Sequence, residues 1–153
     1  MATLKEGDKA PNFTAKDQNG KTVSLADFKG TNVILYFYPK DDTPGCTAEA
    51  CSFRDNYQSM LSKGFQVIGV STDDEKSHKK FETKYNLPFP LIADTDKSIV
   101  EAYGVWGEKN MFGKKYMGTI RKTFLINAAG IIDEIIDKVD TQNSSQQVID
   151  LLQ

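Results

Sequence analysis

Two kinds of hydrophobic pattern divide the chain into expected strands and helices. The segment Val33–Tyr38 is continuously apolar and rich in β-branched and aromatic residues. This pattern predicts a central strand that is buried on both faces. Further strands are predicted at 65–72, 89–94, 123–127 and 131–136, the last two joined by a tight turn at Gly130. Near the start, residues 13–25 predict a β-hairpin whose turn is Asn19-Gly20.

Apolar residues at helical spacing predict the remaining elements. They recur between residues 48 and 61, and Gly64 supplies a stop signal. Further helices are predicted after a cap at Asp73 or Asp74, at 97–104 and at 144–153. This order of elements predicts an α/β fold with a mixed central sheet flanked by helices. It is compatible with a thioredoxin-like fold extended by the N-terminal β-hairpin and by an insert around residues 73–118.

Composition and charge exclude several classes of function. Hydrophobic residues make up 39% and charged residues 26% of the 153 residues, and no linker divides them. One globular domain spanning 1–153 is therefore expected. The formal net charge is −2 with no long basic block, so neither nucleic acid nor a membrane is an expected partner. The start lacks the apolar run of a signal peptide, and we expect a cytoplasmic protein.

Both cysteines lie in the stretch TPGCTAEAC, which runs from Thr43 to Cys51. Their spacing of five positions matches neither the Cys-x-x-Cys redox motif nor a common zinc pattern. Thr43 is a suitable N-cap and Pro44 suits the first helical position, so Cys46 is expected in the first turn. There, unpaired N–H groups and the helix dipole favour a thiolate over a thiol.

Charged residues elsewhere in the chain would act on this thiolate. Asp41 and Asp42 would oppose it if they lie close, so a nearby cation is needed. Arg121 is the first candidate. It would lie near Cys46 if the strand that it opens pairs antiparallel with the central strand. Arg54, on the same expected helix as Cys46, is the second candidate.

Cys51 adds a geometric constraint. On an ideal helix, Cα atoms five positions apart are separated by roughly 8–9 Å, beyond the ~7 Å limit for a disulfide. A disulfide would therefore require the first turns to unwind. The residues alone leave three interpretations open: two small buried hydrophobic residues, a redox pair, or a metal site. Zinc would need further ligands, and the only histidine, His78, is expected to be a solvated helix residue.

The segments YPKDDTPGCTAEACSFRD and GTIRKTFLI closely resemble the peroxiredoxins. The closest branch is the bacterioferritin comigratory protein or peroxiredoxin Q type. The family motif Pro-x-x-x-Thr-x-x-Cys is matched by Pro39, Thr43 and Cys46. Cys51 matches the second cysteine of the branch, and Arg121 matches its distal arginine. The resemblance covers essentially the whole chain.

This resemblance implies a thioredoxin-like fold and a thiol peroxidase without metal or organic cofactor. Cys46 would attack the O–O bond of hydrogen peroxide or an alkyl hydroperoxide and become a sulfenic acid, which Cys51 would resolve as a disulfide. Thr43 and Arg121 would hold the peroxide oxygens, and Pro39 would shape the pocket. A thioredoxin-like dithiol protein would reduce the disulfide, and a monomer would suffice for this chemistry.

Two competing functions are a thioredoxin-type dithiol–disulfide reductase and a non-enzymatic redox sensor. The spacing of the cysteines argues against the reductase, as does the absence of a proline just before the strand that Arg121 opens. Glu49 is expected only to cap the helix or to bind the loop. An apolar wall beside the site and ordinary packing are both open for Trp106, Met111 and Phe112.

Overall fold

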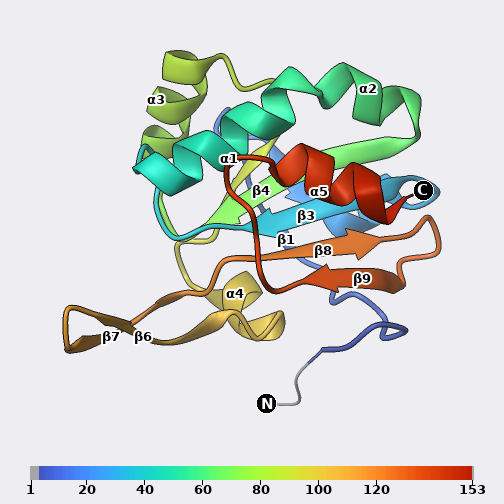
Figure 1. The fold of residues 1–153 in the computed structure, drawn as a ribbon. Coiled ribbons are helices and arrows are strands. Elements are labelled where there is room, and N and C mark those ends of the chain that lie inside the picture. Colours follow the sequence, from blue (N-terminus) through green and yellow to red (C-terminus); the bar gives the residue numbers. More distant parts are fainter. Residues whose placement is uncertain (1–3, 153) are drawn as a thin grey trace.

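The computed structural model describes residues 4–152 and contains one mixed sheet of seven strands with helices on both faces (Figure 1). The strand order is β2-β1-β5-β4-β3-β8-β9, and β6 and β7 form a separate two-stranded hairpin. The strands are β1 (Thr14–Lys16), β2 (Thr22–Ser24), β3 (Asn32–Phe37), β4 (Phe65–Ser71), β5 (Leu91–Ala93), β6 (Trp106–Met111), β7 (Lys114–Thr119), β8 (Lys122–Ile126) and β9 (Ile132–Ile136). The helices are α1 (Pro44–Asp55), α2 (Tyr57–Ser62), α3 (Glu75–Tyr85), α4 (Ser98–Ala102), α5 (Ser144–Leu151) and the 3₁₀ helix η1 (Leu25–Phe28). Within residues 4–152, no helix is long and apolar enough to cross a membrane.

Strand β3 lies in the middle of the sheet, parallel to β4 and antiparallel to β8. Its alternate side chains enter two apolar cores, one under α1, α2, α3 and α5 and the other beside α4 and the N-terminal segment. The first set is Ile34 and Tyr36, continued by Tyr38 directly after the strand, and the second set is Val33, Leu35 and Phe37. The prediction of a central strand buried on both faces is therefore confirmed.

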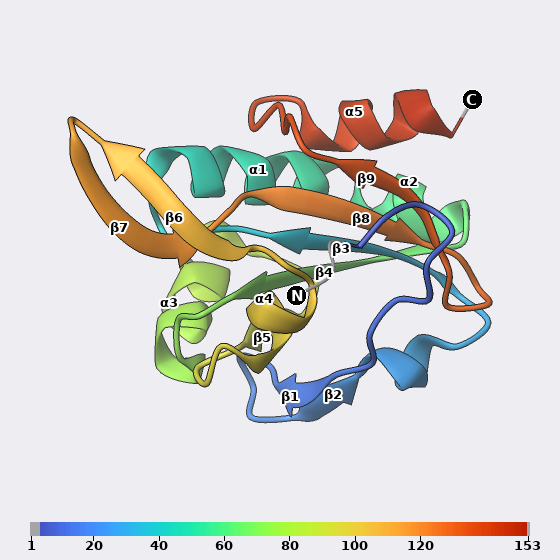
Figure 2. The same ribbon diagram turned by 90° about the horizontal axis from the view of Figure 1, so that it is seen from below.

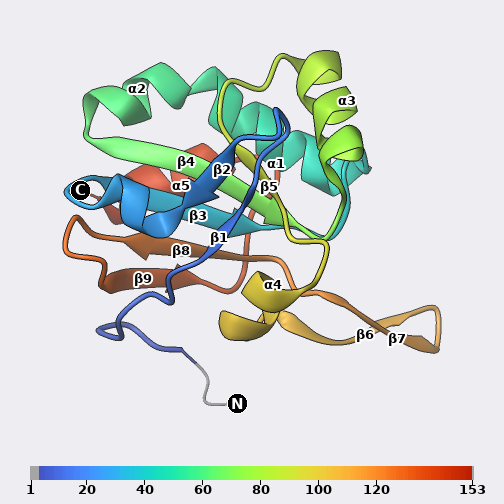
Figure 3. The ribbon, with the colours of Figure 1, turned by 180° about the vertical axis from the view of Figure 1, so that it is seen from behind.

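Most of the other predicted elements are also confirmed, including the N-terminal β-hairpin that extends the sheet (Figure 3). Its turn passes through Gly20, whose φ of +74° lies in the left-handed region that glycine adopts at little cost. Strand β1 pairs antiparallel with β5, so the hairpin adds two strands beside the parallel unit of β3, β4 and β5. The expected α/β class with a mixed central sheet follows from this order.

The structure has two helices where one was expected over residues 48–61, because the helical conformation is interrupted at Asn56. Asn56 has φ −115° and ψ 10°, which is not helical. Its side-chain amide donates to the Ser52 carbonyl oxygen at 3.1 Å and to Ser145 Oγ at 2.8 Å. The side chain thus competes for a carbonyl group that a continuous helix would use, and α1 ends there.

The stretch 106–119, expected to be a connection, forms the hairpin β6–β7 instead. Figure 2 shows it projecting from the body on the side where α1 begins. Phe112 and Gly113 in its turn have φ of +53° and +81°, as in the tight turns that suit the twist of a hairpin. Most of its side chains are not buried on either face. Alternate positions along β6 and β7 therefore do not divide into an apolar and a polar set. For this reason the sequence carries no strand signal here.

Candidate active site

The side chain of Cys46 lies in the interior, between α1 and the sheet. The chain leaves β3 at Phe37, passes through the β3–α1 loop (residues 38–43) and enters α1 at Pro44. Cys46 is thus the third residue of the helix, as predicted. The buried positions of α1 recur at helical spacing: Cys46, Glu49, Ala50 and Phe53. Cys46 is 1% exposed, and its place in the first turn puts the sulfur where the helix dipole favours negative charge.

Arg121 contacts Cys46 because β8 pairs antiparallel with β3. Lys122 lies opposite Phe37, so the preceding Arg121 falls beside the β3–α1 loop. Its Nη2 donates a hydrogen bond to Sγ of Cys46 at 3.3 Å. A Cβ atom at Gly45 would lie 3.2 Å from the same Nη2, so the glycine gives the guanidinium room to approach. The antiparallel pairing expected from the sequence is confirmed, and it brings a cation to the sulfur.

Glu49 is a second partner of Arg121, and the sequence did not predict this contact. Nη1 of Arg121 donates to Glu49 Oε1 at 2.7 Å, whereas Oε2 has no hydrogen-bond partner among residues 4–152. Burial raises the pKa of Glu49 to about 7, although Arg121 lowers it. Burial also lowers the pKa of Arg121, but the charges of Cys46 and Glu49 outweigh it, and this pKa lies above its usual value. The spacing of three positions between Cys46 and Glu49 was the available signal, because it puts both on one helix face.

The buried carboxyl of Glu49 is expected to make the stability depend on pH. Its pKa rises from 4.5 to about 7 on folding, so the folded protein keeps a proton that the unfolded chain loses between these values. The free energy of unfolding should therefore fall as pH rises through this window, by roughly 3 kcal/mol at most. In Glu49→Gln this fall should largely disappear, and urea unfolding at pH 5 and pH 8 measures it. Glu101→Gln, at an exposed position of α4, is the matched control; an unchanged fall in Glu49→Gln would contradict the prediction.

Thr43 and Pro39 lie on the β3–α1 loop together. Pro39 is half-buried at the end of β3. Thr43 occupies the N-cap position of α1, but its side chain makes no capping hydrogen bond, contrary to the expectation. Its Oγ1 instead donates to the Lys40 carbonyl oxygen at 2.9 Å. Because its only proton is used there, the hydroxyl can act only as an acceptor toward another molecule.

Cys51 lies further along α1, half-buried, and both cysteines carry free thiols. The helix is continuous over both residues, so the ideal Cα separation of roughly 8–9 Å applies to them. Beyond Cys51, α1 is tied to α5 by a hydrogen bond of 2.9 Å between Ser52 Oγ and Ser145 Oγ. The second cysteine is thus close in sequence but outside bonding reach.

Asp41 and Asp42 point toward α3, so their charges have partners other than the Cys46 sulfur. Asp42 accepts a hydrogen bond from Lys84 Nζ at 2.8 Å, and this contact contributes to lowering the pKa of its carboxyl. Asp41 lies 2.7 Å from His78 Nδ1. The sequence suggested that both aspartates would repel the Cys46 thiolate. In the structure, each of their carboxylates is instead paired with a basic residue of α3.

Two basic residues lie elsewhere than the sequence suggested. The prediction of a solvated His78 is wrong, because its side chain is fully buried on the face of α3 that also carries Phe81. His78 and Phe81 are three positions apart and so share one helix face, but the charged residues around His78 made this pattern hard to recognise in the sequence. Arg54, the second cation candidate, donates to the Tyr85 carbonyl oxygen at 2.8 Å and pairs with Asp55. It therefore joins α1 to the end of α3.

Lys109 on β6 is a cation near the site that the sequence did not reveal. Its Nζ donates to the Thr119 carbonyl oxygen at 2.9 Å. Burial and the charge of Arg121 lower its pKa, while Cys46 raises it. Its ammonium thus lies within electrostatic range of both residues. No sequence signal marked it, because the hairpin that carries it was not predicted.

The apolar residues of the hairpin do not form a wall beside the site. Met111 and Phe112 lie at its tip and are 56% and 101% exposed. Trp106 packs against the core next to α4, and Lys97 Nζ lies 5.2 Å from the centre of its ring. Ordinary packing is thus the outcome for Trp106.

A family model described as the AhpC/TSA family matches residues 6–135. The chain belongs to this family. Among its relatives, a putative peroxiredoxin bcp of Coxiella burnetii is 49% identical, with 96% of this chain and 97% of the relative covered. Peroxiredoxin Bcp of Bacillus subtilis is 45% identical, with 98% and 96% covered.

Solved structures of peroxiredoxins support the same assignment. PrxQ of Xylella fastidiosa is 31% identical and superposes with a TM-score of 0.93 over 99% of this chain and 97% of that one. The bacterioferritin comigratory protein of Xanthomonas campestris is 34% identical, with a TM-score of 0.86 over 92% and 89%. The thioredoxin-like fold predicted from the sequence is confirmed, and the chain is a peroxiredoxin of the Bcp and peroxiredoxin Q type.

Proposed function

We propose that this peroxiredoxin reduces hydrogen peroxide and organic hydroperoxides with Cys46 as the attacking thiolate. The observation that carries the proposal is the contact of Arg121 with both the Cys46 sulfur and the Glu49 carboxylate. The guanidinium holds the sulfur at the start of α1 and offers directional hydrogen bonds there. Relatives named as peroxiredoxins, and a Xanthomonas campestris structure described in terms of alkyl peroxide reduction activity, support the same substrate class.

The first step transfers one oxygen to sulfur. The thiolate of Cys46 forms the S–O bond while the O–O bond breaks, which leaves a sulfenic acid and a hydroxide or alkoxide that takes up a proton. Arg121 and the N–H groups of the first turn of α1 stabilise the charge that develops on the leaving oxygen. The Thr43 hydroxyl accepts a hydrogen bond from the hydroperoxide, since its own proton is held by Lys40. Pro39 shapes the entrance beside the thiolate.

The second step joins Cys46 and Cys51. The first turns of α1 unwind to bring the sulfurs together, and the Cys51 thiolate attacks the sulfenic sulfur. The S–S bond forms as the S–O bond breaks, and the hydroxide that leaves takes up a proton to become water. A thioredoxin-like dithiol protein then reduces the disulfide by thiol exchange. Because both cysteines belong to one chain, a cytoplasmic monomer is sufficient for the cycle.

Stopped-flow mixing of the reduced protein with hydrogen peroxide tests the proposal. The thiol should oxidise far faster than free cysteine, because the site stabilises the transition state. Oxidation at the rate of free cysteine would contradict it. A redox sensor would react without turning over with thioredoxin, and a dithiol–disulfide reductase would instead reduce protein disulfides.

Replacing the second cysteine separates the two steps. Cys51→Ser should keep one fast oxidation of Cys46, because Arg121 and the helix start are unchanged. Turnover with thioredoxin and its reductase should stall, because no disulfide forms. The burst of thiol loss and the steady-state rate are measured on the same sample. Unchanged steady-state turnover would show that Cys51 does not resolve the sulfenic acid.

A further inference from the structure

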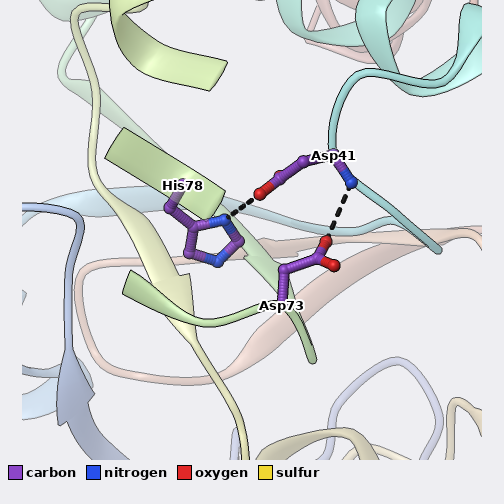
Figure 4. A group of neighbouring side chains, drawn as sticks. All are labelled: Asp41, Asp73 and His78. Atoms are coloured by element: carbon purple, nitrogen blue, oxygen red, sulfur yellow. Dashed lines mark hydrogen bonds and ion pairs between the residues drawn. The ribbon is translucent and has the colours of Figure 1, made fainter. Parts of the chain in front are cut away.

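A buried polar cluster joins the β3–α1 loop to helix α3 (Figure 4). Asp41 is 8% exposed and His78 is 0% exposed. The Asp41 Oδ2 atom lies 2.7 Å from His78 Nδ1 and accepts from Ser77 Oγ at 2.7 Å. The other oxygen, Oδ1, accepts from the Tyr38 hydroxyl at 2.7 Å. The loop that leads to Cys46 is therefore held on α3 by interactions away from water.

The partners of His78 define its protonation. Nε2 lies 2.9 Å from the Ile92 carbonyl oxygen on β5, which can only accept, so Nε2 carries a proton. Nδ1 faces the Asp41 carboxylate. Burial lowers the pKa of His78, but the hydrogen bond and charge of Asp41 outweigh it, and the pKa lies above its usual value. The other titratable groups on this cluster are Tyr38 from the start of the β3–α1 loop and Asp73 from the turn before α3. Both ring nitrogens face oxygen acceptors, and this geometry favours an imidazolium against a carboxylate.

A metal ion is the alternative occupant of this cluster. Ligand atoms of Asp41, Asp73 and His78 lie within 4.8 Å of one another. However, Asp73 Oδ2 already accepts from the Asp41 backbone N–H and from Ser71 Oγ, both at 2.8 Å. A metal would have to displace protons and donors that now satisfy every one of these groups. The hydrogen-bond pattern therefore favours a proton-linked pair over a metal site.

The cluster also marks one border of the segment that must unwind. Before Cys46, the Asp41–His78 pair holds the loop on α3. After Cys51, the Ser52–Ser145 hydrogen bond holds α1 on α5. Between these contacts lie residues 42–51, whose helical part, 44–51, contains both cysteines. Unwinding of this segment breaks the contacts of Arg121 with Cys46 and Glu49, whereas the contacts at its two borders can stay closed.

We propose that Asp41 and His78 are positioning residues: their pair fixes the β3–α1 loop for the reaction of Cys46 and stays closed while α1 unwinds. The inference rests on the proposed peroxidase cycle. It adds that the loop does not open with the helix, so that unwinding is confined to residues between the α3 and α5 contacts. Thr43 then returns to the same place after each reduction.

NMR of the imidazole nitrogens tests whether the pair stays closed. His78 is the only histidine, so its ¹⁵N signals need no assignment. Spectra are recorded at pH 7 on the dithiol protein and on the disulfide made with diamide, an oxidant that does not depend on peroxidase activity. Two protonated ring nitrogens are expected in both states. A neutral imidazole in either state would overturn the proposal, whether or not the protein reduces peroxide.

Variants test whether the pair positions the site. His78→Gln should lower the rate of Cys46 oxidation by peroxide about tenfold or more, because the buried Asp41 carboxylate loses its cation. Asp41→Asn in the same background should restore most of the rate, since two neutral amides can pair; lost packing of the ring would not be restored. A wild-type rate in folded His78→Gln, or no rescue by Asp41→Asn, would overturn the proposal.

The matched control breaks an exposed ion pair between the same loop and the same helix. Lys84→Gln removes the ion-pair partner of Asp42. The side chains of Lys84 and Asp42 are 57% and 41% exposed, so the rate of Cys46 oxidation should change less than about twofold. An equal loss in Lys84→Gln would show that the buried pair has no special role. If His78→Gln alone does not fold, two measurements still test the proposal. They are the rate of Cys46 oxidation in the variant that carries both His78→Gln and Asp41→Asn, and the NMR spectra of the wild-type protein.

Discussion

Cys46→Ser is expected to abolish peroxide reduction while the protein stays folded. A serine hydroxyl is scarcely ionised at neutral pH and needs an adjacent base to act as a nucleophile. The only histidine of the chain is held by Asp41 and by the Ile92 carbonyl oxygen. No imidazole is therefore free to activate the serine, and Arg121 beside it is a cation.

Peroxide consumption in the presence of thioredoxin and its reductase measures this loss. Cys51→Ser is the matched control, because it replaces the other of only two cysteines and should retain one fast oxidation. Circular dichroism and urea unfolding establish that Cys46→Ser is folded. If Cys46→Ser still consumed peroxide faster than free cysteine does, the attacking group would have to be another residue.

The sequence was sufficient for the parts of the site that depend on regular geometry. A continuous apolar run from Val33 to Tyr38 can be satisfied only in the centre of a sheet covered on both faces. Antiparallel pairing then places the start of β8 beside the end of β3, and this brings Arg121 to Cys46. Both inferences use periodicity and register, which local sequence contains.

The buried charges could not be predicted, because their partners are distant in sequence. Glu49 and Arg121 are 72 positions apart, and His78 and Asp41 are 37 positions apart. In isolation, Glu49 and His78 look like ordinary polar residues of a helix, and Asp41 looks like an ordinary loop residue. Burying one of these charged groups is strongly destabilising unless its partner is also in place. Whether such a residue is buried therefore depends on a three-dimensional contact that the local sequence pattern does not contain.

Arg121→Gln is expected to lower the rate of Cys46 oxidation by about 10²–10³, as for the loss of a hydrogen-bond donor that stabilises a transition state. The variant loses both the bond to sulfur at 3.3 Å and the bond to Glu49 Oε1 at 2.7 Å. It also leaves the Glu49 carboxyl buried without its cation, which is expected to lower the free energy of unfolding by about 3 kcal/mol. Stopped-flow oxidation and urea unfolding separate the two losses.

A second substitution distinguishes the effect on rate from the effect on stability. Adding Glu49→Gln to Arg121→Gln removes the uncompensated carboxyl, so most of the stability should return while the rate stays low. Arg54→Gln is the matched control, since Arg54 lies on α1 but contacts Asp55 and the Tyr85 carbonyl oxygen; its rate should stay within about twofold of wild type. Recovery of the rate together with stability in the double variant would mean that Arg121 acts only by neutralising Glu49. If the double variant is stable but still slow, the guanidinium of Arg121 in the wild-type protein acts directly on the reacting atoms.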